Sequence, residues 1–66
     1  TIFRERLKEQ RIKKGWSTIE LASHIQATQP SIVRWENGSR VPNIESLKKL
    51  AIAFDVSADY LLGLED

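Results

Sequence analysis

The chain has 66 residues, of which 41% are apolar, with ten Lys or Arg against nine Asp or Glu and no cysteine. This length allows one small core held by hydrophobic packing alone, because the chain has no cysteine for disulfides and no Cys/His cluster with zinc spacing. No apolar run approaches the roughly 20 residues of a membrane span, and the N-terminal stretch lacks a signal peptide's apolar region, so we expect a cytoplasmic protein without membrane contact.

Charge is distributed unevenly along the sequence. Residues 1–43 carry eight Lys or Arg against four acids, whereas residues 44–66 carry two against five, which gives net charges of +4 and −3. Such asymmetry favours a polyanionic partner at one end of the molecule. Charge runs also occur on faces that are merely solvated, so the asymmetry alone identifies no partner.

The first helix is predicted to begin near Phe3. Phe3 and Leu7 recur at helical spacing, Ile12 is expected near the same face, and Gly15 supplies a stop signal. We expect this face to pack against the core.

A second helix is predicted from Thr18 to about Gln26. The sequence Ser17-Thr18-Ile19-Glu20 matches a capping box, in which the Ser hydroxyl and the Glu carboxylate each bind a backbone N–H at the helix start. The residues expected to face the core are Leu21, Ala22 and Ile25.

A third helix is predicted from Gln29 to about Glu36. Thr28 suits the N-cap position, and Pro30 falls in the first turn, where its missing N–H removes no helical hydrogen bond. Asn37 and Gly38 then end the helical pattern.

Pro42 and Asn43 break the chain and cap a fourth helix. Its apolar stripe has the spacing i, i+3, i+6, i+7, i+10 and comprises Ile44, Leu47, Leu50, Ala51 and Phe54. Asp55 can take the left-handed position that ends this helix, and Ser57 caps a fifth helix that stops at Gly63. No alternating strand pattern competes, so we predict one compact all-α domain of five helices over residues 1–66.

The outward face of the third helix has an unusual composition. Opposite the expected core residues Ile32 and Trp35 lie Gln29, Pro30, Val33 and Arg34. A β-branched apolar residue beside an Arg suits contact with a thymine methyl group and a guanine edge. Periodicity alone leaves a second interpretation open, in which both are ordinary surface residues.

The predicted helices 18–25 and 29–36 are short, and only about three residues join them. This pairing is typical of a helix-turn-helix, here about residues 18–36, whose second helix enters the major groove of DNA. The next loop, 37–40, offers backbone amides, an amide side chain and a cation that could bind phosphate. An ordinary turn is the alternative interpretation of this loop.

Longer stretches match a known family: RLKEQRIKKGWS, ELA, TQPSIVRWENGSRVPN and LKKLAIAFDVSADYLLGL. Over about residues 3–64 the chain resembles the lambda repressor-like, or Cro and XRE-type, helix-turn-helix regulators of prokaryotes and phages. The resemblance implies a sequence-specific DNA-binding transcription regulator, expected to be a repressor of phage, prophage or bacterial type. It implies no cofactor, no metal and no small-molecule substrate.

The resemblance also implies roles for single residues. Gln29 matches a position that contacts an adenine edge and the DNA backbone, and Pro30, Val33 and Arg34 occupy the variable base-reading positions. Phosphate contacts are implied for Ser17, Thr18, Ser31, Asn37, Ser39, Arg40 and Asn43.

Arg11 and Glu36 match an ion pair that ties the first helix to the end of the third.

Three positions depart from the family pattern. Thr18 replaces a frequent Gln that braces the recognition helix, and Gln26 replaces a frequent Gly, where a left-handed backbone would cost Gln about 1 kcal/mol. Pro30 removes a polar base-reading side chain, so specificity is expected to depend on the other three residues.

Two other classes of function compete. An enzyme is a poor alternative, because His24 is the one histidine, is expected at the surface, and no nucleophile and base have a suggestive spacing. A protein-interaction module, such as an antitoxin, is the stronger alternative, since a fold does not fix a function.

One such module covers little DNA, so a homodimer on a palindromic operator is expected, with half-sites about one helical turn, roughly 34 Å, apart. The residues expected in its interface are Val56, Tyr60, Leu61 and Leu64, although Leu61 could instead belong to the core.

Overall fold

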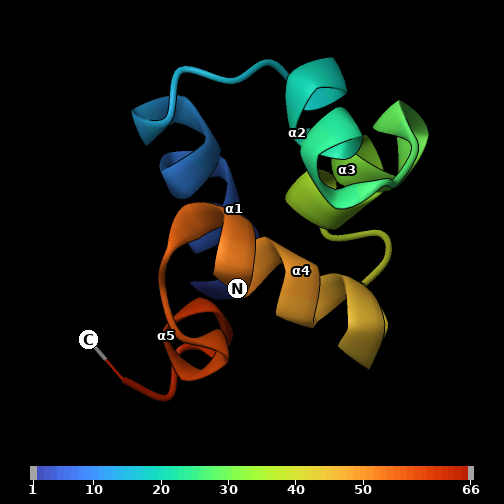
Figure 1. The fold of residues 1–66 in the computed structure, drawn as a ribbon. Coiled ribbons are helices and arrows are strands. Elements are labelled where there is room, and N and C mark those ends of the chain that lie inside the picture. Colours follow the sequence, from blue (N-terminus) through green and yellow to red (C-terminus); the bar gives the residue numbers. More distant parts are fainter. Residues whose placement is uncertain (1, 66) are drawn as a thin grey trace.

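The computed structural model describes residues 2–65, which form five α-helices and their connections (Figure 1). The helices are α1 (Ile2–Lys13), α2 (Thr18–Ile25), α3 (Gln29–Asn37), α4 (Ile44–Phe54) and α5 (Ala58–Leu62). The predicted all-α class is confirmed, and α3 ends one residue later than expected. Within residues 2–65 no helix is long and apolar enough to cross a membrane.

Local sequence determines the helix boundaries. Each helix from α2 to α5 begins at a residue whose side chain accepts a hydrogen bond from the backbone N–H three positions later: Ser17, Thr28, Asn43 and Ser57. Two helices end at left-handed residues other than glycine, Gln26 with φ 57° and Asp55 with φ 58°. The left-handed Asp55 was expected from the helical pattern and the left-handed Gln26 from the family resemblance, and both are confirmed.

The core lies where the five helices meet. In Figure 1, α4 crosses the molecule between the α2–α3 pair and α5, and α1 packs against both α3 and α5. Every helix contributes to the buried apolar cluster, which contains Leu7, Leu21, Ala22, Ile25, Ile32, Trp35, Leu50, Phe54 and Leu61. This arrangement holds α2 and α3 in a fixed relation, so the outer face of α3 is carried on a packed scaffold.

Two apolar residues of the predicted stripes lie outside the core. Ile12 is 59% exposed, because five residues after the buried Leu7 place it roughly 140° around the helix. Ile44 is 85% exposed, because it is the first residue of α4 and lies at the end remote from Leu50 and Phe54. The predicted core positions of Ile12 and Ile44 were therefore wrong.

Candidate nucleic-acid interface

The start of α2 is a capping box, as the sequence predicts. The backbone N–H of Ser17 donates to Oε1 of Glu20 at 2.8 Å, and the N–H of Glu20 donates to Oγ of Ser17 at 3.1 Å. Helix geometry gives the remaining first-turn N–H groups no carbonyl of their own helix, and the helix dipole makes this end electropositive. Together with the exposed hydroxyl of Ser17, this end of α2 can accommodate an anion.

Thr18 links the starts of the two helices. The side-chain amide of Gln29 donates through Nε2 to Oγ1 of Thr18 at 3.1 Å. The shorter side chain at position 18 therefore still braces α3, despite its departure from the family pattern. This bond restrains the Gln29 amide and leaves its carbonyl oxygen and one N–H for another partner.

The two faces of α3 differ sharply in exposure. Ile32 is fully buried and Trp35 is 7% exposed on the inner face, whereas Val33 is 40% exposed on the outer face. The structure brings all four predicted base-reading residues onto exposed surface of this helix: Gln29, Pro30, Val33 and Arg34.

Ser31 is engaged at the start of α3. Its backbone N–H donates to Oγ1 of Thr28 at 3.3 Å, and the two hydroxyl oxygens lie 2.9 Å apart. Ser31 is half-buried, so it is less accessible than the other predicted phosphate-binding residues except Thr18, which is also half-buried.

The loop after α3 is wound around one carbonyl. The backbone N–H groups of Gly38, Ser39 and Arg40 all donate to the carbonyl oxygen of Arg34, those of Ser39 and Arg40 at 3.1 and 3.3 Å. Ser39 N–H also donates to Oδ1 of Asn37 at 2.9 Å. The sequence suggested that these amides could bind phosphate, which was wrong because they are satisfied within the loop. The Ser39 hydroxyl also donates to the carbonyl of Arg34, at 3.5 Å, so the free donors of the loop belong to the side chains of Asn37 and Arg40.

Asn43 has a second structural task at the next helix. Its Oδ1 accepts the backbone N–H of Ser46 at 2.8 Å and so caps α4. Because the oxygen of the Asn43 amide faces the cap, its NH₂ group points the other way and is free to donate. Asn43 is exposed, so a partner in solution can reach this group.

Arg11 and Glu36 form the expected ion pair. Nε and Nη2 of Arg11 donate to the two carboxylate oxygens of Glu36 at 2.7 and 3.2 Å. Nη1 of Arg11 also donates to the carbonyl of Trp16 at 2.8 Å. The side chains of the pair are 14% and 11% exposed, so this bidentate pair anchors the end of α3 to α1 and to the segment before α2.

Arg4 was not singled out by the sequence. Its Nη1 donates to the carbonyl oxygen of Asn37 at 3.4 Å, which brings the first turn of α1 to the end of α3. A contact across 33 positions leaves no trace in helical periodicity or in capping signals. Only its charge on the basic half of the chain could have drawn attention to it.

The expected dimer residues differ in accessibility. Leu61 is fully buried, so of the two roles left open for it the core role is correct and the interface role was wrong. Tyr60 is half-buried, because the guanidinium of Arg6 lies 4.2 Å from the centre of its ring. Val56 also packs against the core, whereas Leu64 is 73% exposed.

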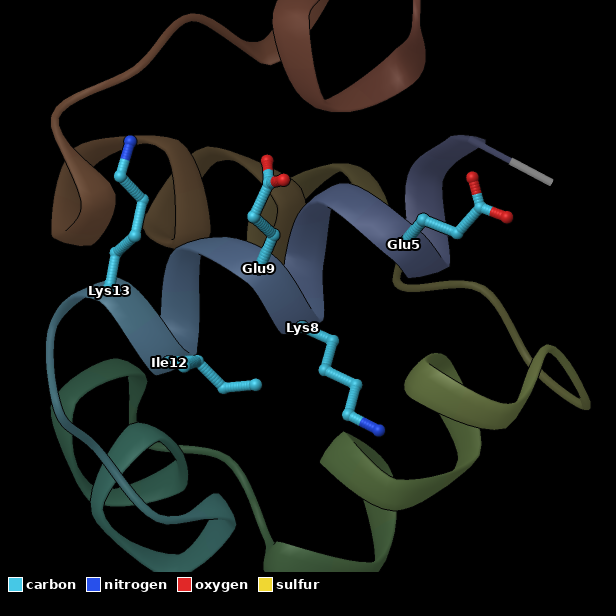
Figure 2. A pocket seen from close by; sticks show the side chains of 5 residues that line it. All are labelled: Glu5, Lys8, Glu9, Ile12 and Lys13. Atoms are coloured by element: carbon cyan, nitrogen blue, oxygen red, sulfur yellow. The ribbon is translucent and has the colours of Figure 1, made fainter.

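A hollow of about 450 Å³ lies on the surface of α1 (Figure 2). Its lining comes from this one helix and consists of Glu5, Lys8, Glu9, Ile12 and Lys13. Figure 2 shows these side chains spreading apart rather than converging on a common point. The hollow is therefore a gap between surface side chains of one helix, with no convergent set of polar groups.

Comparison with known proteins supports the sequence resemblance. A helix-turn-helix family model matches residues 7–61. The HTH-type transcriptional activator BcrR of Enterococcus faecalis is 36% identical over 64 residues, which cover 97% of this chain and 31% of that protein. The HTH-type transcriptional regulator AnsR of Bacillus subtilis (strain 168) is 39% identical over 61 residues, which cover 92% of this chain and 53% of that protein. The chain thus spans about half the length of such relatives, or less.

A solved structure is similar over nearly the whole fold. The P22 c2 repressor protein, crystallised in complex with the synthetic operator 9T, superimposes with a TM-score of 0.88 at 30% identity and covers 92% of each chain. It has the lambda repressor-like fold, which this all-helical chain shares. The family match, the relatives and the structural likeness agree, and the chain belongs to the Cro-type, lambda repressor-like helix-turn-helix family.

Proposed function

We propose that this chain is the DNA-binding module of a sequence-specific transcriptional regulator, and that α3 reads the major groove. The observation that carries the proposal is the outer face of α3, where an amide held by Thr18 stands beside an exposed Val and an exposed Arg. The relatives with regulatory names and the similarity to a repressor bound to its operator support the same function.

Base reading falls to three side chains in this proposal. Gln29 meets an adenine edge with the amide oxygen and N–H that its bond to Thr18 leaves available. Val33 contacts a thymine methyl group, and Arg34 donates two hydrogen bonds to a guanine. Pro30 adds apolar contact alone, because it has no side-chain donor or acceptor.

Phosphate contacts come from both sides of α3. At the start of α2 the donors are the hydroxyls of Ser17 and Thr18 and the free first-turn amides. On the other side they are side-chain groups of the loop and of the α4 cap, because the loop amides are satisfied internally. These side chains are Asn37, Ser39, Arg40 and Asn43. Ser31 adds a further contact if its hydroxyl donates to phosphate while it accepts a hydrogen bond from the Thr28 hydroxyl.

Two copies are needed for a full operator in this proposal. The longest dimension of the domain is 27 Å, whereas successive major-groove half-sites lie roughly 34 Å apart, so one copy reaches one half-site. A second copy of this chain would dock on the aliphatic surface formed by exposed Val41 and Leu62. This surface adjoins a groove of about 260 Å³ lined by Phe3, Val41, Pro42, Leu47 and Leu62. The operator is then a palindrome, and a copy that covers a promoter acts as a repressor.

Selection from a random DNA library tests the proposal. We expect a palindromic site to be enriched, and the logarithm of the binding constant to fall linearly and steeply with the logarithm of the salt concentration. A module that binds only proteins, such as an antitoxin that acts without DNA, would enrich no site and show little salt dependence. That result would reject DNA recognition by this chain.

Variants of the aliphatic surface test the second copy separately. Val41→Asp and Leu62→Asp should each convert two-copy binding on the selected site into weaker one-copy binding, because a charge would be buried between the copies. Sedimentation with operator DNA measures the number of copies bound. Unchanged two-copy binding by both variants would place the protein contact elsewhere.

A further inference from the structure

We propose that Arg4, at the start of α1, is a phosphate-binding residue of the DNA interface and acts together with the loop after α3. The inference rests on the proposed function and adds to it a residue from a helix outside the helix-turn-helix. Three observations lead to it, namely where the guanidinium lies, what charge it meets there, and what the loop lacks.

The guanidinium of Arg4 lies directly on the loop. Nη1 donates to the carbonyl of Asn37, and a Cβ placed on Gly38 would stand 2.6 Å from Nη1, 3.3 Å from Cδ and 3.6 Å from Cζ of Arg4. The guanidinium of Arg4 therefore occupies space that a side chain at position 38 would fill. Gly38 also has φ 83°, so glycine at this position both permits the left-handed turn and leaves room for Arg4.

The charge of Arg4 removes an obstacle to phosphate binding. Asn37 is the last residue of α3, and the carbonyl groups at the end of a helix carry partial negative charge, which repels an anion. Glu36, the acid nearest in sequence to Asn37, is paired with Arg11 and so does not neutralise the charge of Arg4. The positive charge of Arg4 at the Asn37 carbonyl offsets this negative end of the helix dipole. A phosphate can then bind close to the end of α3.

The backbone of the loop has no free donor for a phosphate. Its three backbone N–H groups at 38–40 all point to the Arg34 carbonyl. A guanidinium has five N–H donors, of which Arg4 uses one at Asn37, and the residue is exposed. Arg4 therefore supplies the planar fork that matches a phosphate, at a place where the loop backbone supplies none.

The salt dependence of DNA binding tests the role of Arg4. We would measure the affinity of wild type, Arg4→Gln, Arg4→Lys and Lys13→Gln for the selected operator between about 50 and 200 mM salt. Lys13→Gln is the matched control, because it removes one positive charge from the same helix, roughly 13 Å along its axis. In Figure 2 the Lys13 side chain projects to the same side of α1 as Glu5 and Glu9.

Arg4→Gln should lower the salt slope by about one per half-site and weaken binding equally on all sequences. Arg4→Lys should keep the slope, since the charge remains, and Lys13→Gln should keep both slope and affinity. Circular dichroism and thermal unfolding should show all variants folded as wild type, because each position is exposed.

Two results would overturn the inference without affecting the proposed function. One is an unchanged slope in Arg4→Gln on a site that wild type binds steeply, which would leave Arg4 at most a support for the loop. The other is an equal loss of slope in Lys13→Gln, which would make the effect one of overall charge. A wild type that selects no site and shows no salt dependence would instead reject both proposals together.

Discussion

The inner and outer faces of α3 lie on the same nine residues and follow opposite rules. On the inner face, Ile32 and Trp35 are buried, and they stabilise the fold by filling space in the core. On the outer face, Val33 and Arg34 are exposed and contribute little to the core. The difference teaches that stability and recognition are separable in this helix, residue by residue. Substitutions on one face should change folding, and substitutions on the other should change DNA binding.

The largest effect is expected from Ile32→Ala. Ile32 is fully buried, so losing every side-chain carbon beyond Cβ leaves a cavity and should lower the free energy of unfolding by about 2–5 kcal/mol. A domain of this length has a total stability of about 3–10 kcal/mol, so the variant should be largely unfolded at modest urea concentrations. Urea titration followed by circular dichroism measures the change.

Val33→Ala is the matched control for Ile32→Ala. It removes apolar side-chain atoms at the adjacent position, where 40% exposure leaves less packing to lose, and should cost less than about 1 kcal/mol. Equal costs at the two positions would contradict the division of α3 into a packing face and a reading face.

The next effect is expected where α3 is fastened to α1. Glu36→Gln leaves the guanidinium of Arg11 without its charged partner, and we expect a loss of about 2–3 kcal/mol, at or below the range for fully buried pairs. Glu5→Gln, an exposed acid on α1, is the control and should change stability by less than about 0.5 kcal/mol. Unfolding free energies of the two variants that agree within error would reject an anchoring role for the pair.

Much of the scaffold around α3 could be predicted because its causes are local. The caps at Ser17 and Asn43 and the left-handed Asp55 depend on neighbours within one helical turn, and the sequence displays those neighbours. Helical periodicity likewise separated Ile32 from Val33. The pair of Arg11 and Glu36 was expected only through the family resemblance, since no local rule joins positions 25 apart.

The errors arose where tertiary packing decides. The sequence left Leu61 open between interface and core, because a short apolar helix gives no sign of which side a neighbouring helix covers. The backbone amides of loop 37–40 were expected to be free. Three of them instead donate to the carbonyl of Arg34, which depends on the conformation of the loop and not on its composition. Arg4 was missed for the same reason, since its partner lies on another helix.

On the outer face, the largest effect is expected from Arg34→Ala. A bidentate contact with guanine is worth about 1–3 kcal/mol of discrimination, so one base position in each half-site should lose its preference. Stability should stay within about 0.5 kcal/mol, because the loop is organised by the carbonyl of Arg34 and truncation leaves the backbone intact. Binding to operators with all four bases at each position shows which preference disappears. A uniform loss across positions would assign Arg34 to phosphate instead.

A smaller effect on the same face is expected from Thr18→Val, which has nearly the same shape but no hydroxyl. The Gln29 amide loses the acceptor at 3.1 Å that restrains it, so preference at the adenine position should weaken by about 0.5–1.5 kcal/mol. Thr28→Val changes a hydroxyl that caps α3 and is the control: it should lower stability while the adenine preference persists. A Thr18→Val variant that retains full preference would show that Gln29 needs no brace.

The smallest effect is expected in the turn that sets α3 against α2, at Gln26→Gly. The left-handed backbone at φ 57° costs Gln about 1 kcal/mol, which glycine removes, but glycine also raises the entropy of the unfolded chain by a similar amount. The two terms oppose each other, so the net change in unfolding free energy should be close to zero and clearly smaller than the cost of the control below. Ser23→Gly, inside α2, has no strain to relieve and should destabilise the fold by about 0.5 kcal/mol. If both glycines cost the same, the backbone of Gln26 is not strained, and the turn is held by its hydrogen bonds to Ala22 and Ser23 alone.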